Sequence, residues 1–125
     1  MERKDALAQI AKKWPGLTTT KSGLMFEITK KGSGGSPSPT SQVSVNYTGT
    51  LLDGKVFDST TARGKPASFQ VNKVIPGWTE ALVAMTRGEK RLLVIPPELG
   101  YGEPGYPGVI PPNSFLVFEV ELIDF

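Results

Sequence analysis

The sequence predicts an α+β domain in which an antiparallel sheet packs against one short helix. A short helix is predicted within residues 74–85, starting at Pro76-Gly77 and ending before Gly88. Its apolar residues three and four positions apart share one face: Trp78, Ala81, Leu82 and Met85. The clearest strand is 116–122, where apolar residues alternate with Glu119 and Glu121. This alternation indicates a sheet with one dry face and one wet face. No regular strand–helix–strand succession runs along the chain, which argues against a parallel sheet.

The composition excludes several classes of function. The 125 residues suffice for one domain, and the net charge of +2 is too small to indicate nucleic-acid binding. No apolar stretch approaches the ~20 residues that span a bilayer. The chain has no Cys and no His, which removes thiol nucleophiles, the commonest general base and the usual zinc ligands. We expect no metal and no cofactor, and any catalysis should need no proton shuttle near neutral pH.

The N-terminal segment predicts a helical arm. Apolar residues with helical spacing indicate an amphipathic helix over about residues 5–13, which Pro15 and Gly16 end: Leu7, Ile10, Ala11 and Trp14. A helix this short is unstable alone in water. It therefore docks on the body, frays, pairs with a second copy or tethers another domain. Residues 17–22 form a polar connector, so we divide the chain into an arm at 1–22 and a domain at 23–125.

The remaining strands follow from alternation and turn signals. Asp53-Gly54 predicts a tight turn between two strands, and residues 30–39 and 60–66 are predicted loops. The predicted strands are 24–29, 42–52, 56–59, 67–71, 90–95 and 116–122.

Residues 96–112 form a long segment without helix or strand periodicity. Its prolines fix backbone φ angles, which argues against a floppy linker. Its apolar side chains suit either the wall of a pocket or a lid packed on the core: Tyr101, Tyr106, Val109 and Ile110. Trp78 likewise has two interpretations: it is either a simple core residue or part of a site.

Several motifs, taken in order, resemble the FKBP family of macrolide-binding peptidyl-prolyl cis-trans isomerases. The motifs are Val45-Asn46-Tyr47-Thr48-Gly49, Asp53-Gly54-Lys55-Val56-Phe57-Asp58-Ser59, Val74-Ile75-Pro76-Gly77-Trp78, Tyr101-Gly102, Pro107-Gly108-Val109-Ile110-Pro111-Pro112-Asn113 and Leu116-Val117-Phe118-Glu119-Val120-Glu121-Leu122. The resemblance covers residues 23–125, and residues 20–28 look most like the bacterial branch that includes the macrophage infectivity potentiator proteins. It implies a twisted antiparallel sheet of about five strands wrapped around one short helix.

The resemblance also implies a site. The residues expected to act in catalysis are Asp58, Tyr101, Ile75 and Trp78, with Trp78 as the floor of the pocket. The residues expected to bind substrate are Tyr47, Phe57, Val74, Tyr106, Val109, Ile110 and Phe118. One position departs from the family pattern: Ala67 stands where many members have a pocket Phe. Phe69 matches another family aromatic, at the pocket edge or in the core.

The function implied is isomerisation of X-Pro peptide bonds in protein folding, in an apolar pocket and without a covalent step. The alternatives are a module that binds or chaperones Pro-containing segments without turnover, and a purely structural domain. Expected partners are proline-containing polypeptides and macrolides such as tacrolimus or rapamycin. We expect a monomer, or a dimer through the arm. The N-terminus lacks the apolar core of a signal peptide, so we expect a cytoplasmic protein, or a periplasmic one if the chain was processed or trimmed.

Overall fold

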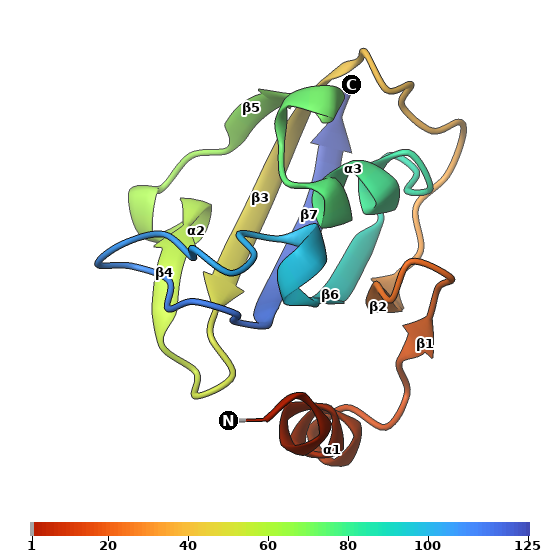
Figure 1. The fold of residues 1–125 in the computed structure, drawn as a ribbon. Helices are drawn as coiled ribbons and strands as arrows, with labels where there is room; N and C mark the ends of the chain where they lie inside the picture. The colour runs from red at the N-terminus through yellow and green to blue at the C-terminus, as the bar shows by residue number, and fades with distance from the viewer. Residues whose placement is uncertain (1) are drawn as a thin grey trace.

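The computed structural model describes residues 2–125 and has the expected α+β architecture (Figure 1). Met1, the first residue of the predicted arm, lies outside the described residues. Within residues 2–125, seven strands form one sheet: β1 (Thr18–Thr19), β2 (Met25–Lys30), β3 (Gln42–Thr50), β4 (Val56–Ser59), β5 (Ala67–Gln70), β6 (Lys90–Ile95) and β7 (Leu116–Asp124). The helices described are α1 (Arg3–Lys13), α2 (Thr60–Arg63) and α3 (Pro76–Leu82), with 3-10 turns η1 (Val71–Lys73) and η2 (Pro97–Leu99).

The sheet is antiparallel throughout the described residues, with the order β1-β2-β6-β7-β3-β4. The long strands β3 and β7 run side by side through its middle (Figure 1). The other edge of β3 is shared by two short strands, because β5 pairs with residues 42–45 and β4 with residues 48–50. The connection between β4 and β5 therefore lies beside β3.

That connection contains a helix that the sequence analysis missed. Residues 60–66 were expected to be a loop, and this was wrong at 60–63, which form α2. The Oγ of Ser59 accepts a hydrogen bond from the N–H of Ala62 at 3.4 Å and caps the helix start. Gly64 has a φ of 76° and ends the helix in the left-handed conformation.

The main core lies between α3 and one face of the sheet. All four residues of the predicted helix face are buried there, although α3 ends at Leu82 and Met85 lies in the turn that follows. The strand β7 contributes the alternate residues predicted for the dry face: Leu116, Phe118, Val120 and Leu122. Pro76 occupies the first turn of α3, where its missing N–H costs no helical hydrogen bond.

The helix α1 docks on the opposite face of the sheet and forms a second cluster, called here the outer cluster. It consists of Ala6, Ile10, Met25, Leu92, Val94, Phe115 and Val117. The predicted buried face of α1 was partly wrong, because Ala6 and Ile10 are buried whereas Leu7 and Ala11 are exposed. Docking supplies the apolar contact that so short a helix needs. It also covers part of the sheet face that was expected to be wet.

None of the helices in residues 2–125 is long and apolar enough to cross a membrane.

Candidate functional site

An apolar cavity of about 440 Å³ lies between α3 and the sheet. We call it the aromatic cavity, and it is lined by Tyr47, Phe57, Asp58, Phe69, Lys73, Val74, Ile75, Trp78, Tyr101 and Phe118. These residues come from β3, β4, β5, β7, the segment from η1 to α3, and the long loop. The fold thus brings together residues that are up to 71 positions apart in the chain.

Three aromatic rings pack edge to face on Trp78, and a fourth ring packs edge to face on one of these three. The ring centroids of Trp78 lie 4.9 Å from Tyr47, 5.2 Å from Phe118 and 5.7 Å from Phe69, at interplanar angles of 82° to 88°. Phe57 meets Phe118 at 5.5 Å and 87°. Such edge-to-face pairs stabilise an aromatic cluster beyond the burial of its area. They also fix the shape of the cavity, because moving one ring disturbs the next.

Gly49 on β3 allows two of these rings to meet. A Cβ atom at this position would lie 2.7 Å from ring carbons of both Phe57 and Phe118. That separation is well inside the usual contact distance between carbon atoms. The glycine in the Tyr47-Thr48-Gly49 motif is therefore explained by the packing of the cavity wall.

Asp58 is the one carboxylate that lines the aromatic cavity, and both of its oxygens are engaged. The hydroxyl of Tyr47 donates to Oδ2 at 2.5 Å, and Nη1 of Arg63 donates to Oδ1 at 2.6 Å. Burial favours a raised pKa for Asp58, but the hydrogen bonds from Tyr47 and Arg63 outweigh it and lower the pKa below the ordinary value. Asp58 is therefore an ionised acceptor that orients Tyr47.

Three donors at the cavity are left without a partner in residues 2–125. The indole Nε1 of Trp78 is buried and makes no hydrogen bond. The N–H of Ile75 precedes α3 and donates to no group in the described chain, while its carbonyl accepts from Trp78 and Thr79. The hydroxyl of Tyr101, whose side chain is 38% exposed, also has no partner among the described residues. Buried donors are normally satisfied, so the buried Nε1 of Trp78 is suited to a ligand that supplies an oxygen acceptor. The half-buried N–H of Ile75 and the more exposed hydroxyl of Tyr101 can donate to carbonyl oxygens of the same ligand.

Three of the predicted binding residues do not line the aromatic cavity. Ile110 is buried in the main core, whereas Tyr106 and Val109 are exposed on the long loop. The loop closes on itself, because the backbones of Tyr106 and Ile110 exchange hydrogen bonds of 2.8 and 2.7 Å. Tyr106 packs edge to face on Tyr101 with ring centroids 5.8 Å apart. Tyr106 thus supports the ring of Tyr101 from the solvent side.

Sequence reasoning missed two charged residues of the site: Arg63, which pairs with Asp58, and Lys73, which lines the cavity. Arg63 was placed in a predicted loop. In the structure it is the last residue of α2, and this helix brings its guanidinium to Asp58. The spacing of Ser59 and Gly64 around a short polar segment is a capping signal that would have revealed the helix. Lys73 lies at the end of η1. Its position at the cavity depends on tertiary packing, which no local sequence pattern predicts.

Replacing Tyr101 with Phe is expected to weaken peptide turnover or macrolide affinity several-fold with little loss of stability. The change removes only the unengaged hydroxyl and keeps the ring that packs on Tyr106. A neutral hydrogen bond has a net worth of ~0.5–1.5 kcal/mol. Steady-state kinetics and thermal unfolding are measured for the wild-type protein and for Tyr101→Phe. Unchanged kinetics would assign Tyr101 to loop packing alone.

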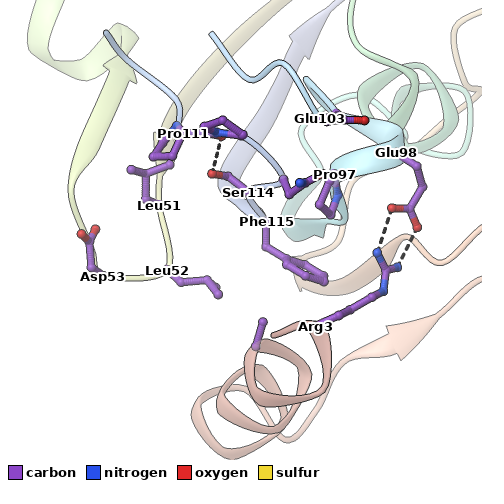
Figure 2. Close-up of a pocket in the computed structure, with 14 residues that line it drawn as sticks. Arg3, Leu51, Leu52, Asp53, Pro97, Glu98, Glu103, Pro111, Ser114 and Phe115 are labelled. Atoms are coloured by element: carbon purple, nitrogen blue, oxygen red, sulfur yellow. Dashed lines mark hydrogen bonds and ion pairs between the residues drawn. The ribbon is translucent and has the colours of Figure 1, made fainter. Parts of the chain in front are cut away.

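A larger cleft of about 870 Å³ lies elsewhere, between α1, the β3–β4 turn and the residues before β7 (Figure 2). At its edge Arg3 forms a two-point ion pair with Glu98, at 2.7 and 2.9 Å. The guanidinium of Arg3 also lies 5.3 Å from the ring centroid of Phe115. These contacts fasten the start of α1 to the body. None of the three unengaged donors described above lines this cleft, so the aromatic cavity is the better candidate site.

The described residues contain no group of three or more His, Cys, Asp or Glu side chains placed to hold a metal ion.

Comparison with known proteins identifies close relatives. The family described as FKBP-type peptidyl-prolyl cis-trans isomerase matches residues 34–123. The chain is 55% identical over 118 residues to the FKBP-type 22 kDa peptidyl-prolyl cis-trans isomerase of Escherichia coli K12, covering 94% of this chain and 57% of the relative. It is 47% identical over 119 residues to outer membrane protein MIP of Legionella longbeachae, covering 95% of this chain and 51% of the relative.

A solved structure shares the fold. The crystal structure of FkpA from Escherichia coli superimposes with a TM-score of 0.88 at 50% sequence identity, covering 97% of this chain and 56% of that one. The chain thus spans about half the length of the relatives it matches.

Proposed function

Because this chain belongs to the FKBP-type peptidyl-prolyl cis-trans isomerase family, we propose that it catalyses cis/trans isomerisation of X-Pro peptide bonds in the aromatic cavity. The observation that carries the proposal is the combination of an apolar aromatic lining with three unengaged donors around Trp78. The substrates are proline-containing polypeptides, and the role is assistance in protein folding. The resemblance noted in the sequence, including that to the macrophage infectivity potentiator branch, is confirmed by the relatives.

The reaction is a rotation, and no bond has to be cleaved. Resonance gives the peptide C–N bond double-bond character and a barrier of ~18–20 kcal/mol. The planar amide is more dipolar than the twisted transition state, in which resonance is lost. An apolar, water-poor cavity therefore disfavours the ground state relative to the transition state. The rings of Tyr47, Phe57, Trp78 and Phe118 provide such surroundings in this chain.

The polar groups of the cavity position the substrate. In this proposal the prolyl ring rests on Trp78, and the N–H of Ile75 and the hydroxyl of Tyr101 hold carbonyl oxygens of the peptide. Asp58 orients Tyr47, and Arg63 fixes Asp58 in turn. Val74 completes one wall. Tyr106 and Val109, exposed on the long loop, contact the flanking parts of a polypeptide, and Ile110 holds the base of that loop in the core.

A protease-coupled assay on a short X-Pro peptide tests the proposal. Uncatalysed exchange takes tens to hundreds of seconds at 25 °C, so catalysis appears as a faster approach to complete cleavage. Binding of the peptide without faster exchange would favour the alternative, a module that holds Pro-containing segments. Absence of both binding and turnover would leave a structural domain.

Macrolides such as tacrolimus or rapamycin are proposed ligands of the same cavity. Ala67, where many family members have a Phe, pairs with Val45 in the sheet and does not line the cavity. Phe69, two residues later, lines it and packs against both Tyr47 and Trp78. We propose that Phe69 supplies the aromatic wall that Ala67 lacks. Competition of a macrolide with peptide turnover tests the shared site.

For organisation, we propose an arm at residues 1–22 and an isomerase domain at 23–125, with the chain as a monomer. The docked position of α1 supports a monomer, because Ala6 and Ile10 are already buried in the outer cluster. Dimerisation through the arm is the alternative. We propose a cytoplasmic location, with the periplasm as the alternative for a processed or trimmed chain. The name of the Legionella relative, an outer membrane protein, favours that alternative.

The value of kcat/KM is expected to be nearly constant from about pH 5.5 to 8.5, because catalysis moves no proton. Asp58 has a lowered pKa and stays ionised in this range. Burial raises the pKa of both Tyr47 and Tyr101, so their hydroxyls stay protonated. The stabilising contribution of Asp58 is complete above its unfolded pKa and is lost only as the pH falls through the lower folded pKa.

The pH profile is measured on a peptide with blocked termini and no ionisable side chains. A bell-shaped profile centred in this range would contradict the mechanism and would indicate a working acid or base.

A further inference from the structure

The rim of the aromatic cavity carries an unbalanced positive charge. Among the ten lining residues only Asp58 and Lys73 have charged side chains. Asp58 is already paired with Arg63. Lys73 is exposed and takes part in no ion pair within residues 2–125. The charges of Asp58 and Arg63 offset each other, so Lys73 sets the sign of the charge that an approaching polypeptide meets.

The position of Lys73 places this charge beside the proposed peptide path. It is the last residue of η1 and is followed at once by Val74 and Ile75, which form one wall of the cavity. The unengaged N–H of Ile75, the proposed anchor for a substrate carbonyl, is only two residues away in the chain. The flexible stem of a lysine lets its ammonium group follow a substrate side chain at the rim.

We propose that Lys73 is a specificity-determining residue that favours X-Pro bonds with an acidic side chain directly before or directly after the proline. The proposal rests on the proposed isomerase function of the cavity. The ammonium group of Lys73 attracts a Glu or Asp side chain of the substrate and repels a Lys or Arg side chain. Exposed ion pairs are weak, so the expected preference for Glu over Gln is roughly two- to five-fold in kcat/KM.

Exchange NMR on blocked peptides measures the preference. Peptides carry Glu, Gln or Lys either just before or just after the proline, and each is measured at low ionic strength, where screening is weakest. The wild-type chain is expected to turn over Glu faster than Gln and Gln faster than Lys in at least one of the two positions. Lys73→Glu is expected to reverse this order, and Lys73→Gln to abolish it. Added salt is expected to reduce the wild-type preference.

Lys12→Glu is the matched control. It makes the same change in net charge but lies on α1, across the sheet from the cavity, so it is expected to keep the wild-type order. Equal turnover of all three peptides by the wild-type chain would overturn the role of Lys73. Reversal by Lys12→Glu as large as that by Lys73→Glu would overturn it as well. Failure to accelerate even the Gln peptides would instead refute the proposed isomerase function.

Discussion

Replacing Trp78 with Ala is expected to lower the free energy of unfolding and to abolish peptide binding together. Trp78 is 4% exposed and contacts three aromatic rings edge to face. Loss of a buried aromatic side chain costs ~3–5 kcal/mol. The same ring forms the floor on which the prolyl ring is proposed to rest. Denaturant unfolding gives the first effect, and titration with an X-Pro peptide, at a temperature where the variant is folded, gives the second.

The second tryptophan of the chain offers a control for this substitution. Trp14 is half-buried and packs against the outer cluster, away from the aromatic cavity. Trp14→Ala is expected to destabilise the protein less and to leave peptide binding unchanged. A Trp78→Ala protein with wild-type stability would show that the helix face is not packed as described. Retained peptide binding would remove Trp78 from the site.

Replacing Ile10 with Ala is expected to destabilise the protein by ~2–5 kcal/mol, the usual range for a fully buried Ile. Ile10 is 1% exposed and, with Ala6, is one of the two α1 residues buried in the outer cluster. Isomerase kinetics on short peptides are expected to stay unchanged, because this cluster lies on the other face of the sheet from the aromatic cavity. Chemical denaturation and kinetics on the folded variant measure the two effects.

Leu7 provides the matched control on the same helix, because its side chain is 39% exposed. Leu7→Ala is therefore expected to change the unfolding free energy far less than Ile10→Ala. Equal losses at the two positions would mean that α1 is not docked by the face described. Lost turnover in folded Ile10→Ala would mean that the arm helps to complete the site.

The strands and the main core were predictable because their signals are local. Alternation along β7 identified the buried residues, and the i, i+3, i+4, i+7 spacing around Trp78 identified the helix face. The boundaries of β4 and β6 agree with the predicted ranges, 56–59 and 90–95. Each of these features depends on side chains that point to one side of a single element.

Features set by tertiary packing were harder to predict. The buried face of α1 centres on Ala6 and Ile10 rather than on Leu7 and Ala11, because the sheet determines which side of a weakly amphipathic helix is covered. The two-residue strand β1 is too short to have a periodicity, and it exists through its pairing with β2.

The residues of the candidate site were also predictable only where their signal was local. Most aromatic residues in the family motifs line one cavity, as predicted. Arg63 and Lys73 were missed because their positions depend on how α2 and η1 pack near that cavity. Tyr106, Val109 and Ile110 share a loop with Tyr101, yet the loop closes on itself and turns them elsewhere. Position in a functional loop therefore did not predict which side chains line the cavity.

The central claim is that X-Pro bonds rotate in the aromatic cavity, and a single NMR titration tests both the turnover and its location. A blocked X-Pro peptide is added to the labelled protein, and cis/trans exchange of the peptide is recorded together with the two indole N–H signals. We predict exchange cross-peaks far faster than the uncatalysed rate of tens to hundreds of seconds. We also predict a shift of the Trp78 signal, whose Nε1 has no partner in residues 2–125, and an unchanged Trp14 signal. Absence of accelerated exchange, or a shift confined to Trp14, would contradict the account.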